Sequence, residues 1–326
     1  MGTWQTEAFV PRRGLRGGHK QTLASFFLSR RIPLPPAEER LIEVEPGVKV
    51  LCHCHWQPDR KNALTILIIH GLEGSSDSQY MLGIAAKGMA AGMNVVRMNQ
   101  RNCGGTEALS PTLYHSGRSQ DIAAVAKDLI DRDGISRFAL AGFSMGGNLV
   151  LKLAGEWGRE APPQFLAVAA VCPAVDLGPS ADALHLPSNR LYEYYFVIKL
   201  RQRLREKARL FPGHFDLSRL RGVSTLRDFD DKITAYYCGF TGADDYYARA
   251  AAAPVLDRIA VPALILHAAN DPFIRILPET RRKILANPNI TFVETEDGGH
   301  CSFLADPDSD DGHWAERQIL QFFQHL

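Results

Sequence analysis

A serine stands between two glycines in the stretch Gly142-Phe143-Ser144-Met145-Gly146. An apolar run ends just before it and a helix-like apolar pattern begins just after it, so the serine is expected at a sharp strand-to-helix turn. Glycine neighbours, which carry no Cβ, let the flanking backbone segments approach closely at such a turn. Because the turn exposes the serine hydroxyl, the pattern predicts a nucleophile for acyl transfer.

A serine hydroxyl needs a base at neutral pH, and in chains with this turn an acid and then a histidine follow the serine. His300 lies on a glycine-rich loop after the last predicted strand, whereas the other histidines that follow Ser144 fall in helical segments or in a strand. Asp271 ends the preceding strand and is the expected acid. Asp176, which ends an earlier strand, is the alternative, and Asp297 is too near His300 in the chain to be preferred.

Acyl transfer also requires hydrogen-bond donors for the oxygen that becomes negatively charged. The backbone N–H of Met145, the residue after the serine, is one expected donor. The second is expected from the loop after the third predicted strand, where the N–H of Leu72 follows His70 and Gly71. A backbone donor places no demand on its own side chain, so an apolar Leu72 suits this role. We expect His70 to be a structural member of the loop.

The segments that must position these residues alternate between apolar strands and helical patterns. Strand-like runs occupy 63–71, 94–101, 135–144, 165–176, 261–271 and 289–300, and a hairpin pattern at 40–56 precedes them. Such alternation predicts an α/β protein with a mostly parallel sheet covered by helices on both faces. In sheets of this kind the functional site lies beyond the carboxyl ends of the strands.

The chain divides into three predicted parts. Residues 1–39 form a basic, proline-punctuated arm that is expected to pack on the core. The α/β core comprises 40–176 and 246–326. Residues 177–245 contain no strand-like run and predict a helical cap inserted between the sixth and seventh main strands.

Composition limits the partners of the protein. The chain has 326 residues and a net charge of +1, which gives no reason to expect nucleic acid. No window reaches 18 consecutive apolar residues, so no transmembrane segment is expected. The six scattered cysteines indicate reduced thiols in a cytoplasm.

One cationic segment leaves peripheral membrane contact open. It lies in the predicted cap, where a solvated helix face is the favoured interpretation and an anionic lipid surface the alternative. Its members are Lys199, Arg201, Arg203, Arg205, Lys207 and Arg209.

Two patterns invite a metal interpretation, and neither supports one. In the run 52–55, which reads Cys-His-Cys-His, the cysteines and histidines of a strand face opposite sides and do not converge on one ion. The acidic stretch 306–312 lacks the glycine and the glutamate that a calcium loop requires. We therefore expect no metal and no cofactor. Cys301, beside His300, is expected to be a packing residue, with a redox-sensitive thiol as the alternative.

Seven short motifs together resemble one known family. In chain order they are GGHKQTL, HGLEGSSDSQY, NQRNCGGT, YHSGRSQD, GFSMGGN, NDPF and GGHCSF. The chain is similar, from about residue 10 to its end, to the YheT-like group of α/β-hydrolases. Asn102 stands where glycine is expected in this pattern. The resemblance implies an α/β-hydrolase fold, carboxylic ester hydrolysis with short- to medium-chain acyl groups, and a triad of Ser144, Asp271 and His300.

The sequence therefore predicts a serine carboxylesterase that acts on a small-molecule acyl ester through an acyl-enzyme. The same intermediate serves an alcohol acyltransferase or a thioesterase, and these remain the alternatives. A binding protein on the same scaffold is a more distant possibility, because fold alone does not establish activity. The oligomeric state is left open by the sequence.

Overall fold

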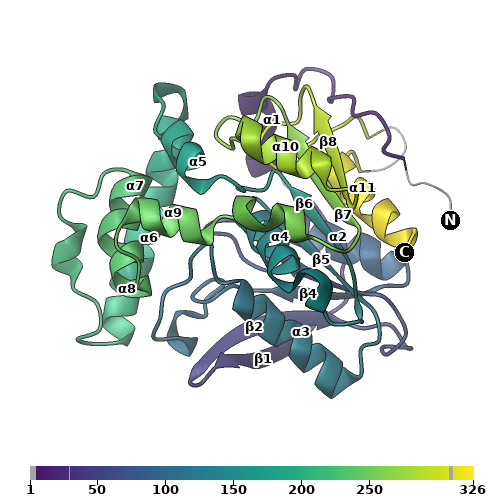
Figure 1. Cartoon of the computed structure of the whole chain (residues 1–326), viewed down its shortest axis with the longest axis horizontal. Coiled ribbons are helices and arrows are strands. Elements are labelled where there is room, and N and C mark those ends of the chain that lie inside the picture. Colours follow the sequence, from purple (N-terminus) through teal and green to yellow (C-terminus); the bar gives the residue numbers. More distant parts are fainter. Residues whose placement is uncertain (1–4, 29, 308–310) are drawn as a thin grey trace.

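An eight-stranded sheet forms the centre of the molecule, with the strand order β1-β2-β4-β3-β5-β6-β7-β8 (Figure 1). The computed structural model describes residues 5–28, 30–307 and 311–326. The first two strands form an antiparallel hairpin, β2 pairs antiparallel with β4, and the remaining pairs are parallel. The strands are β1 (Glu38–Glu45), β2 (Val48–His55), β3 (Thr65–Ile69), β4 (Asn94–Met98), β5 (Phe138–Phe143), β6 (Phe165–Val171), β7 (Ala263–Ala268) and β8 (Ile290–Thr295).

Helices cover both faces of this sheet because the central strands are apolar on both sides. Along β3, Leu67 and Ile69 pack into one core cluster while Ile66 and Ile68 pack into another. The first cluster includes side chains from α3 (Ser119–Asp133), α4 (Met145–Trp157) and α10 (Pro278–Ala286). The second includes α2 (Gln79–Ala90) and α11 (Trp314–Gln324). The predicted fold class is confirmed.

The segment between β6 and β7 is helical and gathers at one side of the molecule, at the left of Figure 1. The predicted boundary at residue 245 falls inside its last helix. Its α-helices are α5 (Leu177–Leu184), α6 (Arg190–Leu210), α7 (Leu226–Phe229), α8 (Tyr236–Cys238) and α9 (Ala243–Ala250), and a π-helical segment, η5, spans Asp230–Ala235. Short 3₁₀ turns occur at Glu107–Leu109, Gly158–Glu160, Pro187–Asn189, Leu217–Leu220 and Ala253–Arg258.

The cationic segment of α6 is not simply a solvated face, and that interpretation is wrong for two of its residues. Lys207 is fully buried and donates to the carbonyl oxygens of Glu107 and Ser110. Arg203 is also turned inward and binds carboxylates of the core. These contacts tie α6 to the sheet-side loops. Peripheral contact of the remaining cations with lipid stays a prediction.

The N-terminal arm contains a helix that the sequence patterns did not predict, α1 (Gly18–Phe27). Among the described residues, no helix combines the length and the apolar composition that crossing a membrane requires.

In β2, Cys52 and Cys54 are buried in the core, while His55 lies against the Arg97 guanidinium at 3.3 Å. Of the acidic stretch 306–312, residues 308–310 lie outside the described part of the chain.

Candidate active site

Ser144 occupies the turn between β5 and α4 with φ 55° and ψ −118°. A positive φ is uncommon for a residue with a side chain, and such strained backbone concentrates at functional sites. The flanking glycines make the turn possible. A Cβ on Gly146 would overlap the carbonyl oxygen of Ile69, and a Cβ on Gly142 would overlap that of Gly146. The serine therefore stands at the carboxyl end of a central strand, where the sequence predicted it.

The structure brings together the three side chains that the sequence singled out. His300 Nε2 lies 3.0 Å from Ser144 Oγ. On the other side of the ring, His300 Nδ1 lies 2.8 Å from Asp271 Oδ2. The three residues come from the ends of β5, β7 and β8, which are parallel strands and so deliver their loops to the same edge of the sheet.

Asp271 is buried and fully engaged as an acceptor. Its Oδ1 accepts from the backbone N–H groups of Phe273, at 3.0 Å, and Ile274, at 2.9 Å. Burial by itself would raise the pKa of this carboxyl, but the neighbouring His300 and these hydrogen bonds outweigh it and lower the pKa below its ordinary value. The carboxylate therefore stays ionised and holds Nδ1 of His300 in its protonated form.

The alternative acids have other partners. Asp176 accepts from the backbone N–H of Leu277 and from the hydroxyl of Thr280, each at 2.9 Å. Asp297 accepts from the backbone N–H of Gly17 and from the Asn270 side chain, each at 2.8 Å. Each aspartate thus stabilises a loop, and only Asp271 is hydrogen-bonded to His300 within the described parts of the chain.

The N-terminal helix α1 supports the His300 loop, a role that the sequence patterns missed. The backbone N–H of His300 donates to Thr22 Oγ1 at 2.9 Å. The Gln21 side chain exchanges two hydrogen bonds with the backbone of Leu304, at 3.1 and 2.8 Å. Gly299 has φ 59°, and a Cβ there would lie 2.5 Å from the carbonyl oxygen of Gly18. The motif GGHKQTL was the available signal, since its residues make these contacts.

The loop after β3 runs beside the serine. A Cβ on Gly71 would lie 3.2 Å from Ser144 Cβ. His70 is buried, with Nδ1 bonded to the carbonyl oxygen of Gly71 at 2.8 Å and Nε2 accepting from the backbone N–H of Gln100 at 3.1 Å. Burial lowers the pKa of His70 to about 4, so the ring is neutral and structural. Leu72 and Met145 both line the pocket that Ser144 faces.

Glu73, the next residue of this loop, is bound by the cap. Its backbone has φ 55°, and its carboxylate pairs with Arg203 of α6 through Nε–Oε1 at 2.8 Å and Nη2–Oε2 at 2.9 Å. The Tyr114 hydroxyl donates to Oε1 at 2.6 Å. A bidentate pair fixes orientation as well as distance, so the cap holds the strained turn that follows Leu72.

Asn102 occupies a position where glycine was expected. Its backbone conformation is one that glycine adopts readily. It has φ 65°, in the left-handed region. Asparagine tolerates this region better than most residues with a side chain. Its amide also donates to the Thr112 carbonyl oxygen at 2.9 Å, which anchors the loop.

An apolar pocket opens beside Ser144 between the cap and the core. It contains about 950 Å³ of empty space, counting the part open to solvent. Most of its cap-side lining is aliphatic or aromatic, from Leu177, Leu184, Phe196, Leu200, Leu204 and Phe229. Such a surface accommodates a hydrocarbon chain by excluding it from water.

Two cysteines lie beside His300. Cys301 Sγ is 3.9 Å from His300 Nε2, and the backbone N–H of Cys301 donates to Cys172 Sγ at 3.4 Å. Burial opposes ionisation of both His300 and Cys301. The charges of the Cys301 thiolate and of Asp271 nevertheless raise the pKa of His300. Hydrogen bonding to Cys172 and the charge of His300 lower the pKa of Cys301. These three residues bring two sulfur donors and one nitrogen donor within 4.8 Å of one another.

Known proteins resemble this chain in sequence and in fold. A family model described as alpha/beta hydrolase fold matches residues 65–307. A protein of Escherichia coli (strain K12) named as a candidate esterase, YheT, is 30% identical over 95% of this chain and 91% of its own. The human phospholipase ABHD3 is 28% identical over 98% of this chain and 80% of its own.

A solved esterase from Pyrococcus furiosus shares the fold, with a TM-score of 0.58 over 89% of this chain and 92% of that chain, at 16% identity. The family model spans most of the chain, and the resemblance seen in the short motifs extends over nearly its full length. The chain belongs to the α/β-hydrolase family and, within it, to the YheT-like esterases.

Proposed function

We propose that the protein is a serine carboxylesterase in which Ser144, His300 and Asp271 form the catalytic triad. The observation that carries this proposal is the continuous hydrogen-bonded line from Ser144 Oγ through His300 to Asp271. His300 Nε2 accepts the hydroxyl proton as Oγ attacks the ester carbonyl. It then gives that proton to the departing alcohol, and a water molecule activated in the same way releases the acyl group. Asp271 stabilises the imidazolium that forms at each step.

Two backbone donors complete the site. The N–H groups of Leu72 and Met145 have no protein acceptor within the described residues, and both residues line the pocket at Ser144. Donors that are fixed before the reaction stabilise the tetrahedral oxyanion without reorganisation. We therefore assign the oxyanion hole to these two groups.

The acyl group belongs in the apolar pocket under the cap. Its aliphatic and aromatic lining favours a short- to medium-chain hydrocarbon over a polar acid. The related proteins named as an esterase and a phospholipase support a carboxylic ester as the scissile bond.

The cysteines of the described chain are all free thiols, which supports a reducing, cytoplasmic compartment.

The proposal is tested by hydrolysis of p-nitrophenyl acyl esters. Ser144→Ala should lower kcat by about 10⁴-fold or more and abolish labelling by a fluorophosphonate probe. A rate series from C2 to C16 esters then defines the acyl length. Full activity of folded Ser144→Ala would refute the mechanism. Added alcohol separates hydrolysis from acyl transfer, since only a transferase makes new ester efficiently in water. A thioester substrate tests for thioesterase activity.

A further inference from the structure

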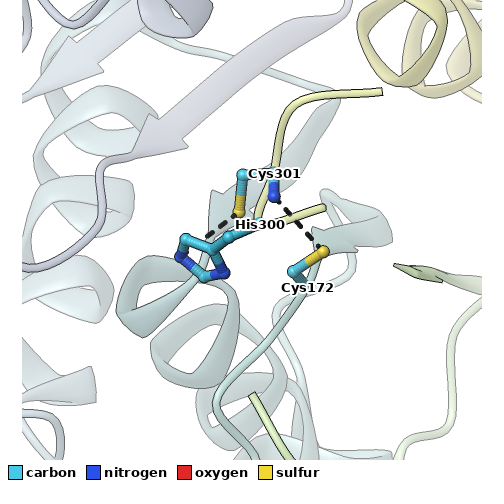
Figure 2. Close-up of side chains that lie close together, drawn as sticks. All are labelled: Cys172, His300 and Cys301. Carbon is cyan, nitrogen blue, oxygen red and sulfur yellow. Dashed lines mark hydrogen bonds between the residues drawn. The ribbon is translucent and has the colours of Figure 1, made fainter. Parts of the chain in front are cut away.

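The cluster of Cys172, His300 and Cys301 presents donors from two loops to one small volume (Figure 2). Cys172 follows β6, and the other two residues follow β8. Their two Sγ atoms and a His300 ring nitrogen lie within 4.8 Å of one another. The triad chemistry uses His300 but needs neither sulfur.

The donor set matches a thiophilic divalent cation. Thiolate and imidazole are the preferred ligands of Zn²⁺, at about 2.3 Å and about 2.0 Å. Tetrahedral geometry with those lengths separates a sulfur from a nitrogen by about 3.5 Å. The observed separation of Cys301 Sγ and His300 Nε2 is 3.9 Å, so an ion requires a movement of only a few tenths of an ångström at this pair.

The surroundings are those of a metal ligand set. Nδ1 of His300 donates to the Asp271 carboxylate at 2.8 Å, and this arrangement orients Nε2 outward as in carboxylate–histidine–zinc sites. Burial raises the pKa of Cys172, and the Cys301 N–H bond to its Sγ, at 3.4 Å, offsets part of that effect. Ser144 Oγ lies 3.0 Å from Nε2, so an oxygen donor is also close to that nitrogen.

A second grouping of donors is less suitable. Cys172 also lies near His267 and Asp271. The Asp271 carboxylate, however, already accepts from two backbone N–H groups and from His300. Binding an ion there would cost those hydrogen bonds, whereas Cys172 and Cys301 lose only weak sulfur contacts.

We propose that Cys172, Cys301 and His300 form a binding site for Zn²⁺, and that the bound ion switches the enzyme off. The switching step rests on the proposed esterase function, because the ion occupies the Nε2 lone pair that accepts the proton of Ser144. Binding releases two protons, one from the Cys172 thiol and one that Cys301 and His300 share, and the resulting thiolates neutralise the charge of the ion. Removal of the ion by a chelator returns the free triad.

Binding is tested without reference to activity. Co²⁺ added to reduced protein should give thiolate-to-metal charge-transfer absorption at one ion per chain, and Zn²⁺ should abolish it by displacement. Ser144→Ala should retain the band, so failure of the esterase proposal is separable from failure of this site. Cys172→Ser and Cys301→Ser should each weaken binding by at least about 10-fold. Cys238→Ser, which removes a cysteine of α8 in the cap, should bind as wild type.

Inhibition supplies the second readout. Zn²⁺ should suppress ester hydrolysis in parallel with occupancy, and EDTA should restore it. Each variant is compared with its own metal-free rate, after circular dichroism has established that it is folded. Absence of the charge-transfer band in the wild type, or wild-type affinity in both folded cysteine variants, would overturn the site. Recovery with a reductant but not with EDTA would assign the loss to thiol oxidation and also overturn it.

Discussion

Arg203 of the cap and Glu73 of the loop after β3 form a bidentate ion pair, with Nε–Oε1 at 2.8 Å and Nη2–Oε2 at 2.9 Å. The Glu73 side chain is only 2% exposed, and its backbone is held in the left-handed region. The residue before it, Leu72, carries one of the two proposed oxyanion donors. The cap therefore lines the acyl pocket and also, through Arg203, holds the strained turn that carries the proposed oxyanion donor Leu72.

Removing this pair should impair the chemical step more than binding. Arg203→Ala leaves the buried Glu73 carboxylate without its counter-ion and with the Tyr114 hydroxyl as its remaining side-chain donor, so the turn that positions the Leu72 N–H should relax. We expect kcat to fall by about 10-fold or more, less than the roughly 10²–10³-fold loss of a whole oxyanion donor, with a smaller change in KM. Arg203→Lys should recover part of kcat, because an ammonium group cannot bind both carboxylate oxygens in the same way. Arg205→Ala, an exposed neighbour on α6, is the control, and equal kcat values for both alanine variants would refute the coupling.

The assignment of the acid makes a separate prediction. Asp271→Asn keeps the shape of the side chain but no longer stabilises the His300 imidazolium, so kcat should fall by about 10⁴-fold. Asp176→Asn serves as the matched control, because this carboxyl bonds the Leu277 N–H and the Thr280 hydroxyl instead. It should alter thermal stability and leave kcat within a few-fold of wild type. The reverse ranking of the two kcat values would transfer the role to Asp176.

The proximity of Cys301 to His300 should be visible in the pH profile. Negative charge on Cys301 raises the pKa of His300, and the base works only when it is neutral. The rising limb of kcat/KM should therefore lie above the ordinary histidine pKa of about 6.5. Cys301→Ala removes the charge, so the limb should move to lower pH. Profiles are measured with EDTA present, and Cys238→Ala should leave the limb in place. A limb that does not move with Cys301→Ala would show that the sulfur does not influence the base.

Helix α1 should be required for an ordered base. In Thr22→Val the half-buried N–H of His300 loses its acceptor, and the cost has an upper bound of about 1–3 kcal/mol, the range for a fully buried unsatisfied group. Both Tm and kcat should decrease, and Thr22→Ser should restore them because it keeps the hydroxyl. Thermal melts and initial rates check this. If Thr22→Val and Thr22→Ser behave alike, the hydroxyl contact is unimportant.

Local pattern was sufficient for much of the fold. Continuous apolar runs predicted the central strands because strands of a parallel sheet are buried on both faces. The hairpin at 40–56 was predicted from its alternation and appears as β1 and β2. Helix α1 was missed, since its stabilising contacts come from residues near 300 rather than from its own sequence. The cationic run of α6 was misread for the same reason, because the carboxylate that engages Arg203 lies 130 positions away.

By itself, the sequence determined the strained serine turn, because the glycines and the strand end that form it are local. It also determined the order in which a nucleophile, an acid and a base follow one another along the chain. It could not choose by geometry between Asp271 and Asp176. It also gave no sign that the cap would bind Glu73, or that Cys172 would lie beside Cys301. Only the tertiary structure decided these points, because parallel strands bring to one edge loops that are more than 100 residues apart in the chain.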